Sequence, residues 1–232
     1  MKKVAIVTAA SMGMGKACAI ELIESGYIVV IMSRSEEILK VSKEIGADGV
    51  QGSITCKEDL KSLVDFTISK HGRVDGVVNN AGYIPKGELL ELSDDNWHEG
   101  LDIVIGSVNS MLKLVTPIFQ AQGGGSVVNI STFAAYEPSA VFPISACMRA
   151  ALGSYIKLYA DKYAKDNIRI NNVLPGFVNS KPENEKFVKQ IPMGRYAKVE
   201  EIAKSVRFLL SDDASYTTGQ NIRIDGGITR SV

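Results

Sequence analysis

The sequence has no excess of either charge, few cysteines and no long apolar run. Lys+Arg and Asp+Glu each number 26, so the formal net charge is zero, which excludes the basic surface typical of nucleic-acid-binding proteins. The three cysteines, Cys18, Cys56 and Cys147, cannot all pair and lack metal-ligand spacing, which predicts reduced thiols and no metal site. No run approaches the ~20 apolar residues of a membrane-spanning helix, and Gly13 and Gly15 interrupt the apolar start where a signal sequence would continue. We expect a soluble, cytoplasmic protein that binds neither nucleic acid nor membrane.

Short apolar segments rich in β-branched residues alternate with longer segments of helical periodicity. The expected strands occupy residues 4–7, 28–32, 74–78, 127–130, 168–173 and 222–224. The expected helices occupy residues 16–24, 36–45, 58–70, 97–119, 145–165 and 200–210. Because strands that are apolar throughout are buried on both faces, the pattern predicts a parallel sheet with helices on each side. No repeat or linker divides the chain, so we expect one α/β domain over residues 1–232, a Rossmann-type doubly wound sheet of about seven strands.

Four motifs occur in the order and at the spacing of a known family. A first apolar strand runs into the glycine-bearing turn 8–15 (TAASMGMG), and residues 79–82 (NNAG) close another strand. Residues 175–178 (PGFV) follow a third strand, and 225–227 (DGG) lie near the end of the sequence. Over roughly residues 2–227 the chain resembles the short-chain dehydrogenase/reductase family. The resemblance implies an oxidoreductase with a nicotinamide cofactor.

The turn 8–15 is suited to binding a pyrophosphate. It opens into a helix, whose free backbone N–H groups and positive end attract phosphate, and glycines let the phosphates come close. The family writes this turn Thr-Gly-x-x-x-Gly-x-Gly, whereas here Ala9 stands at the first glycine and only Gly13 and Gly15 remain. If the first position needs a positive φ, alanine there costs ~1–2 kcal/mol.

The segment after the second strand favours NADP(H) over NAD(H). Ser33, Arg34 and Ser35 supply a cation and hydroxyls suited to a 2′-phosphate and no acid for a ribose hydroxyl. A solvated Arg34 at the start of a helix is the alternative. The family's adenine-contacting Asp is replaced by Ser53, and Ser180 keeps the hydroxyl of the threonine that bonds the carboxamide. The resemblance implies this set of cofactor-binding residues: Thr8, Ser11, Gly13, Met14, Gly15, Ser33, Arg34, Ser53, Ile54, Asn80, Ala81, Gly82, Arg149, Pro175, Gly176, Val178 and Ser180.

The family's catalytic residues are all replaced. In the family a Ser orients the substrate oxygen, a Tyr transfers the proton, a Lys four residues later lowers the pKa of that Tyr, and an Asn supports a water relay. Here no tyrosine is followed four residues later by a lysine, and the four positions hold Thr132, Ser145, Arg149 and Val104. Thr132 keeps a hydroxyl and Arg149 a positive charge. Ser145 is too short and too weakly acidic to replace tyrosine, and Val104 cannot order a water, so we predict that the usual acid–base chemistry is lost.

No other residue presents itself as a replacement catalyst. Tyr136 lies on the loop after the fifth strand and is interpreted as a packed or rim aromatic, with Glu137 as a solvated charge. Cys147 faces away from the Ser145 side of its helix. His98 and His71 are expected at the surface.

The family resemblance implies a homotetramer or homodimer. The helices at 97–119 and 145–165 commonly form subunit interfaces in the family. Tyr155, Tyr159 and Tyr163 repeat every four residues on the second helix, which predicts either an aromatic interface stripe or a stripe that faces the core.

Three functions remain open on the sequence alone. The first is an NADP-dependent oxidoreductase that acts on an unidentified small carbonyl or alcohol with a non-standard proton donor. The second is a catalytically inactive nicotinamide-nucleotide sensor or assembly subunit, and the third is a structural subunit with an empty site. The short, charged segment 181–190, which corresponds to the family's lid, argues against a steroid-sized ligand.

Overall fold

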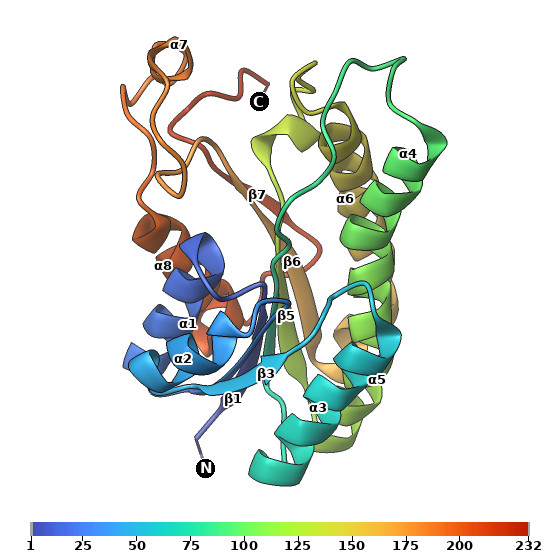
Figure 1. Ribbon diagram of the computed structural model, residues 1–232. Helices are drawn as coiled ribbons and strands as arrows, with labels where there is room; N and C mark the ends of the chain where they lie inside the picture. Colours follow the sequence, from blue (N-terminus) through green and yellow to red (C-terminus); the bar gives the residue numbers. More distant parts are fainter. Residues whose placement is uncertain (1, 232) are drawn as a thin grey trace.

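The computed structural model describes residues 2–231, which form a seven-stranded parallel sheet covered by helices on both faces (Figure 1). The strands lie in the order β3-β2-β1-β4-β5-β6-β7, and each neighbouring pair is parallel. Their bounds are β1 Val4–Thr8, β2 Ile28–Ser33, β3 Asp48–Gln51, β4 Gly76–Asn79, β5 Gly125–Ile130, β6 Ile168–Pro175 and β7 Asn221–Ile224. The doubly wound sheet predicted from the sequence is confirmed.

Successive side chains of each strand point to opposite faces and build two hydrophobic cores. On β1, Ala5 and Val7 belong to one core and Ile6 to the other, and all five residues of the strand are buried. The first core is covered by α1 Gly13–Glu24, α2 Glu37–Ile45 and α8 Val199–Leu210. The second is covered by α3 Lys57–His71, α5 Ser107–Gln122 and α6 Pro143–Tyr163. Burial on both faces is the reason that the strands are apolar without alternation.

One helical stretch, Asp94–Gln122, is long and apolar enough by length and composition to cross a membrane, and an 18-residue window within it has a mean hydropathy of 1.3. It consists of α4 Asp94–Leu101, the π-helical turn Asp102–Gly106 and α5. This finding differs from the expectation that the chain has no membrane-length segment. The buried side chains of α5, among them Met111 and Phe119, pack in the second core, which accounts for the apolar composition.

The tyrosine stripe of α6 faces the core. Tyr159 is buried and its hydroxyl lies 2.6 Å from the Thr116 hydroxyl, while the Tyr155 hydroxyl donates to Asn109 Oδ1 at 2.9 Å. Burial raises the pKa of Tyr159 to about 12, so its phenol stays protonated at neutral pH. The core-facing alternative is therefore confirmed, and the stripe gives no support to an aromatic interface.

Candidate functional site

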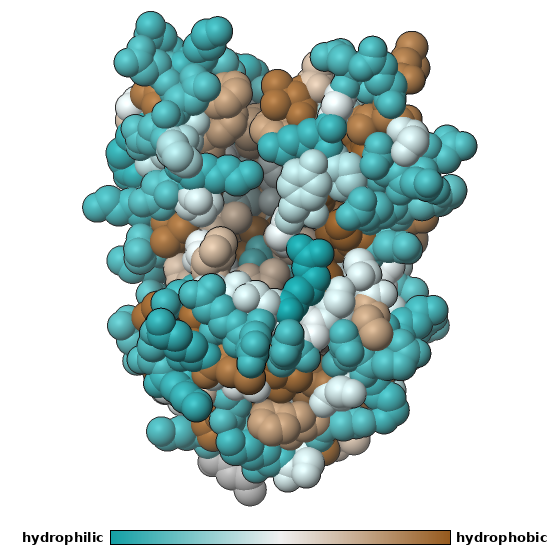
Figure 2. All heavy atoms as spheres, in the orientation of Figure 1, coloured by the Kyte–Doolittle hydropathy of each residue, from teal (hydrophilic) through white to brown (hydrophobic). Residues whose placement is uncertain are grey.

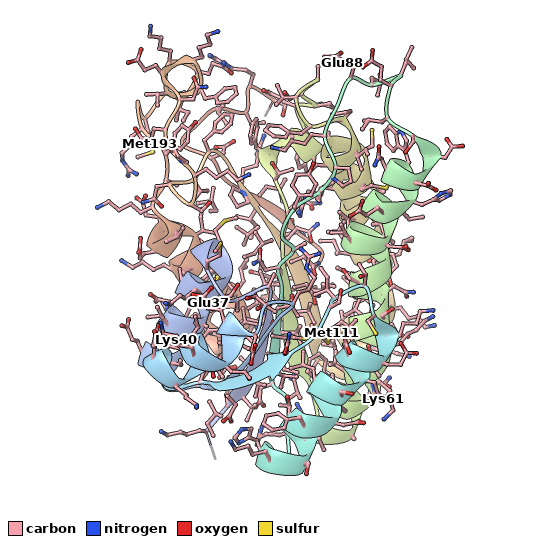
Figure 3. The ribbon with its side chains drawn as sticks, viewed as in Figure 1. Glu37, Lys40, Lys61, Glu88, Met111 and Met193 are labelled. Carbon is pink, nitrogen blue, oxygen red and sulfur yellow. The ribbon has the colours of Figure 1, made fainter. Side chains whose placement is uncertain are left out.

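The candidate site is a cleft above the carboxyl ends of the central strands, where doubly wound sheets bind ligands. Two adjoining cavities of about 980 Å³ and 610 Å³ form it. Figure 2 shows the hollow between the two upper lobes of the molecule. Glu88, in the loop after β4, and Met193, after α7 Glu185–Val188, lie near the tops of the two lobes (Figure 3). The larger cavity is lined by three of the four catalytic positions, Thr132, Ser145 and Arg149, and the smaller by the residues after β2 and β3.

The turn after β1 has the backbone conformation that glycine normally supplies. Ala9 lies at φ +47°, and Gly13 lies at φ +57°. A Cβ atom on Gly15 would lie 2.5 Å from the Ala9 carbonyl oxygen, so that position accepts glycine alone without rearrangement. Thr8 Oγ1 donates to the Asn80 carbonyl at 2.8 Å, and Asn80 Nδ2 donates to the Ala9 carbonyl at 3.1 Å. The turn and the NNAG segment therefore fix each other in place.

Replacing Ala9 by glycine is expected to raise the free energy of unfolding by about 1 kcal/mol. The left-handed region costs a non-glycine residue roughly 1–2 kcal/mol, and the greater chain entropy of glycine offsets part of the gain. Urea denaturation measures the change. Ala10→Gly is the matched control, because Ala10 is fully buried and its loss removes packing. Equal destabilisation by both variants would contradict the strain at Ala9.

The smaller cavity brings together the residues expected to bind the adenosine end of a cofactor. Ser33, Arg34, Ser53 and Ile54 all line it, and Arg34 is exposed and has no ion pair within residues 2–231. The Ser53 backbone N–H donates to Asp59 Oδ2 at 2.8 Å, so a carboxylate of α3 stabilises the loop at the adenine position. The opposite wall carries acidic residues of α4 and of the π-helical turn: Asp95, Glu99 and Asp102.

The loop after β6 also forms part of the cleft. A Cβ atom on Gly176 would lie 2.9 Å from the Asp225 carbonyl oxygen, which explains the glycine that follows Pro175. Ser180 lines the larger cavity beside Gly13 and Met14, whereas the Val178 side chain is buried beneath. The expected cofactor-binding residues of the three loops therefore lie along one cleft, and their individual roles remain predictions.

The catalytic positions are assembled, with altered chemistry. Thr132 and Ser145 are half-buried and line the larger cavity, and Thr132 Oγ1 accepts a hydrogen bond from the Ala134 N–H at 3.4 Å. Arg149 is buried, and its Nη1 donates to the Ile130 carbonyl at the end of β5. Burial lowers the pKa of Arg149 to about 10, so its guanidinium remains charged at neutral pH. The position one helical turn before this cation holds Ser145, so the side chain there is an aliphatic hydroxyl and not a phenol.

Val104 lies in the π-helical turn and borders a small pocket. The pocket measures about 20 Å³ and is also lined by Asn79, Ser107 and Arg149. Such a volume with several polar groups around it accommodates one water molecule. The space next to the lost relay residue is therefore polar and large enough for a water, although Val104 itself provides no hydrogen bond.

A row of four asparagines crosses the sheet beneath the site and was not expected from the sequence. Asn79 donates to Asn129 at 2.8 Å, Asn129 to Asn172 at 2.8 Å, and Asn172 to Asn221 at 2.7 Å. These residues occupy matching positions on β4, β5, β6 and β7. An asparagine in or beside each of four consecutive apolar strands was the available signal. We call this row the amide ladder.

The other residues that the sequence analysis considered and set aside as catalysts have structural or surface contacts in the structure. Tyr136 is exposed with the Arg223 guanidinium 5.5 Å from its ring centre, and Glu137 accepts hydrogen bonds from the Arg230 and Ser231 N–H groups. Cys147 is exposed. His71 lies 2.8 Å from Asp48 Oδ2, and His98 is exposed at the rim of the smaller cavity. Between residues 2 and 231 there is no group of three or more His, Cys, Asp or Glu side chains that could hold a metal.

The fold and cleft define a doubly wound α/β protein with a ligand-sized cleft at the carboxyl ends of its strands, and comparison with known proteins gives its family. A family model described as enoyl-(acyl carrier protein) reductase matches residues 8–229. Dehydrogenase/reductase SDR family member 4 of Caenorhabditis elegans is 35% identical, with 97% of this chain and 95% of that protein covered. The 3-oxoacyl-(acyl-carrier-protein) reductase of Thermotoga maritima is 33% identical, with 97% of each chain covered. The crystal structure of YwfH, an NADPH-dependent reductase involved in bacilysin biosynthesis, superposes with a TM-score of 0.93 at 27% identity over the full length of both chains. The chain belongs to the short-chain dehydrogenase/reductase family.

Proposed function

We propose that this protein binds NADP(H) in the cleft and acts as an oxidoreductase on a small carbonyl or alcohol, with a proton donor other than the family tyrosine. The observation that carries the proposal is the cleft and its unsatisfied polar wall. Gly15 and Gly176 let two loops of the cleft pack against the Ala9 and Asp225 backbone, where a Cβ atom has no room, and the buried Ser131 Oγ on the wall of the larger cavity has no hydrogen-bond partner within the described residues. The structural relative YwfH is an NADPH-dependent reductase, which is consistent with this cofactor.

The residues of the chain fit the bound cofactor in separate ways. The N–H groups at the start of α1 suit the pyrophosphate, Arg34 suits the 2′-phosphate, and Ser180 suits the carboxamide. NADPH would supply the hydride for carbonyl reduction. Thr132 keeps a hydroxyl that can donate to a substrate carbonyl, and the buried charge of Arg149 favours negative charge developing nearby.

Calorimetric titration of NADP(H) and NAD(H) into the purified protein tests the cofactor. We expect micromolar binding with a preference for the phosphorylated form. Absence of heat and of any thermal shift at millimolar cofactor would overturn the proposal.

Replacing Arg34 by glutamine is expected to weaken NADPH binding about ten- to a hundredfold and to leave NADH binding almost unchanged. A hydrogen bond to a charged group contributes about 1.5–3 kcal/mol, and only NADPH carries the 2′-phosphate. Lys40→Gln is the matched control, because Lys40 is an exposed cation on α2 that points away from the cavity (Figure 3). Equal loss of affinity for both cofactors would show that Arg34 does not bind the 2′-phosphate.

The second candidate function is a catalytically inactive nicotinamide-nucleotide sensor or assembly subunit. It is favoured by Ser145, which places no acidic side chain at the tyrosine position. It is distinguished from the first by NADPH binding without oxidation across a panel of small aldehydes and ketones.

For either function we propose a cytoplasmic homodimer or homotetramer, as the family resemblance implies. Leu158, an exposed side chain of α6, is consistent with an interface on that helix.

A further inference from the structure

Three lysines line the larger cavity, and two of them, Lys86 and Lys181, come from loops. The third, Lys16 of α1, lies 3.5 Å from the Glu44 carboxylate. Lys86 belongs to the loop that follows β4 and the NNAG segment, and Lys181 directly follows Ser180 in the loop after β6. The Lys86 ammonium lies 4.6 Å from the centre of the Phe142 ring. Phe142 lines the same cavity and is only three residues before Ser145. Lys86 is therefore placed beside the altered catalytic positions.

Neither lysine is neutralised by the protein. Within residues 2–231, no carboxylate lies within ion-pair distance of Lys86 or Lys181. Partial burial and the charge of Lys181 both lower the pKa of Lys86, so the two ammonium groups repel each other electrostatically. The buried Arg149 also lines the cavity and adds a further positive charge to its wall. Acidic residues also line the cavity, and they belong to α1 and α8: Glu21, Glu24 and Glu200.

The wall around the two lysines is apolar. It is formed by Tyr83 and Ile84 next to Lys86, and by Phe133, Phe142 and Phe177. Phe177 stacks on Phe187 of α7 with ring centres 4.4 Å apart, so the short lid is anchored to this wall by an aromatic contact. An apolar pocket with a few convergent charges suits a small ligand that has an apolar body and a charged group.

We propose that Lys86 and Lys181 together bind the anionic group, a carboxylate or a phosphate, of a small carbonyl substrate whose apolar body lies against the aromatic wall. This inference rests on the proposed function, because it assigns the substrate class of the same cleft. Two unpaired cations that converge on a partly desolvated cavity attract an anion strongly. The site thereby selects anionic carbonyl compounds over neutral ones of the same shape.

Three unreactive probes of one shape test the charge preference by calorimetry: 3-phenylpropionate, its neutral amide 3-phenylpropanamide, and 2-phenylethyl phosphate. We expect at least one anion to bind about tenfold or more tightly than the amide, because a charge-assisted hydrogen bond contributes about 1.5–3 kcal/mol. Lys86→Gln and Lys181→Gln should each lower the affinity for that anion about tenfold and leave the affinity for the amide unchanged. The preferred anion distinguishes a carboxylate from a phosphate substrate.

Lys189→Gln is the matched control, because Lys189 belongs to the same lid region and does not line the cavity. Equal binding of anions and amide, no binding of either anion, or full anion affinity in both variants would each overturn the inference. NADPH is titrated into the same samples, so that the two proposals fail separately. Anion binding without NADPH binding would refute the cofactor proposal alone, and NADPH binding without anion preference would refute the lysine site alone.

Discussion

The double substitution Ser145→Tyr and Arg149→Lys is expected to raise carbonyl reduction by NADPH at least about a hundredfold. A positioned general acid contributes typically 10²–10⁴-fold to a rate, and the wild-type residues at these two positions, Ser145 and Arg149, provide no such group. Reduction of a small diketone such as diacetyl, followed by the absorbance of NADPH, measures the gain.

The geometry of α6 supports this expectation. Residues 145 and 149 lie one helical turn apart, and both line the larger cavity. A lysine ammonium next to a phenol favours the phenolate and lowers the tyrosine pKa toward neutrality. The lysine would occupy a fully buried position where the Ile130 carbonyl is already available as an acceptor.

Ser145→Phe with Arg149→Lys is the control, since phenylalanine has the bulk of tyrosine without its proton. Val104→Asn can then be added to the tyrosine–lysine variant, because the small polar pocket beside Val104 has room for a relay water. Equal activity of the tyrosine and phenylalanine variants would contradict the view that the cleft lacks only its acid. If the tyrosine–lysine variant binds NADPH and remains inactive, the missing element lies in the part of the cleft that binds the substrate.

The sequence predicted the parts of the fold that local pattern determines. Uniformly apolar runs located the six expected strands, and glycines located the cofactor turn. β3 was not located, because Asp48–Gln51 is short, has one apolar side chain (Val50) and is nowhere fully buried. It forms at the sheet edge through pairing with β2, which is a tertiary effect that its own side chains do not signal.

The site was predictable only where a single segment forms it. Whether Ala9 needs a positive φ stayed open on the sequence alone, and the structure places it at φ +47°. The amide ladder depends on the register of four strands that are far apart in sequence, and register is set by the assembled sheet. The Lys86 and Lys181 pair depends on two loops separated by almost a hundred residues. Such convergence has no periodicity or spacing to reveal it.

Replacing Asn129 by alanine is expected to lower the free energy of unfolding by about 2–4 kcal/mol. Asn129 is fully buried in the middle of the amide ladder, where it accepts from Asn79 and donates to Asn172. Its loss leaves one donor and one acceptor without a partner, and a buried unsatisfied polar group costs about 1–3 kcal/mol. Urea denaturation at neutral pH measures the change.

Asn109→Ala is the matched control, because Asn109 is partly exposed and gives up a single hydrogen bond from Tyr155, for which we expect about 1 kcal/mol. The double variant Asn129→Ala/Asn172→Ala should lose less than the sum of the two single losses, because the second change removes a group that the first left unpaired. Strict additivity would show that the four amides act independently. Coupling would show that they form one unit, and that unit joins the NNAG strand of the cofactor cleft to the far edge of the sheet at β7.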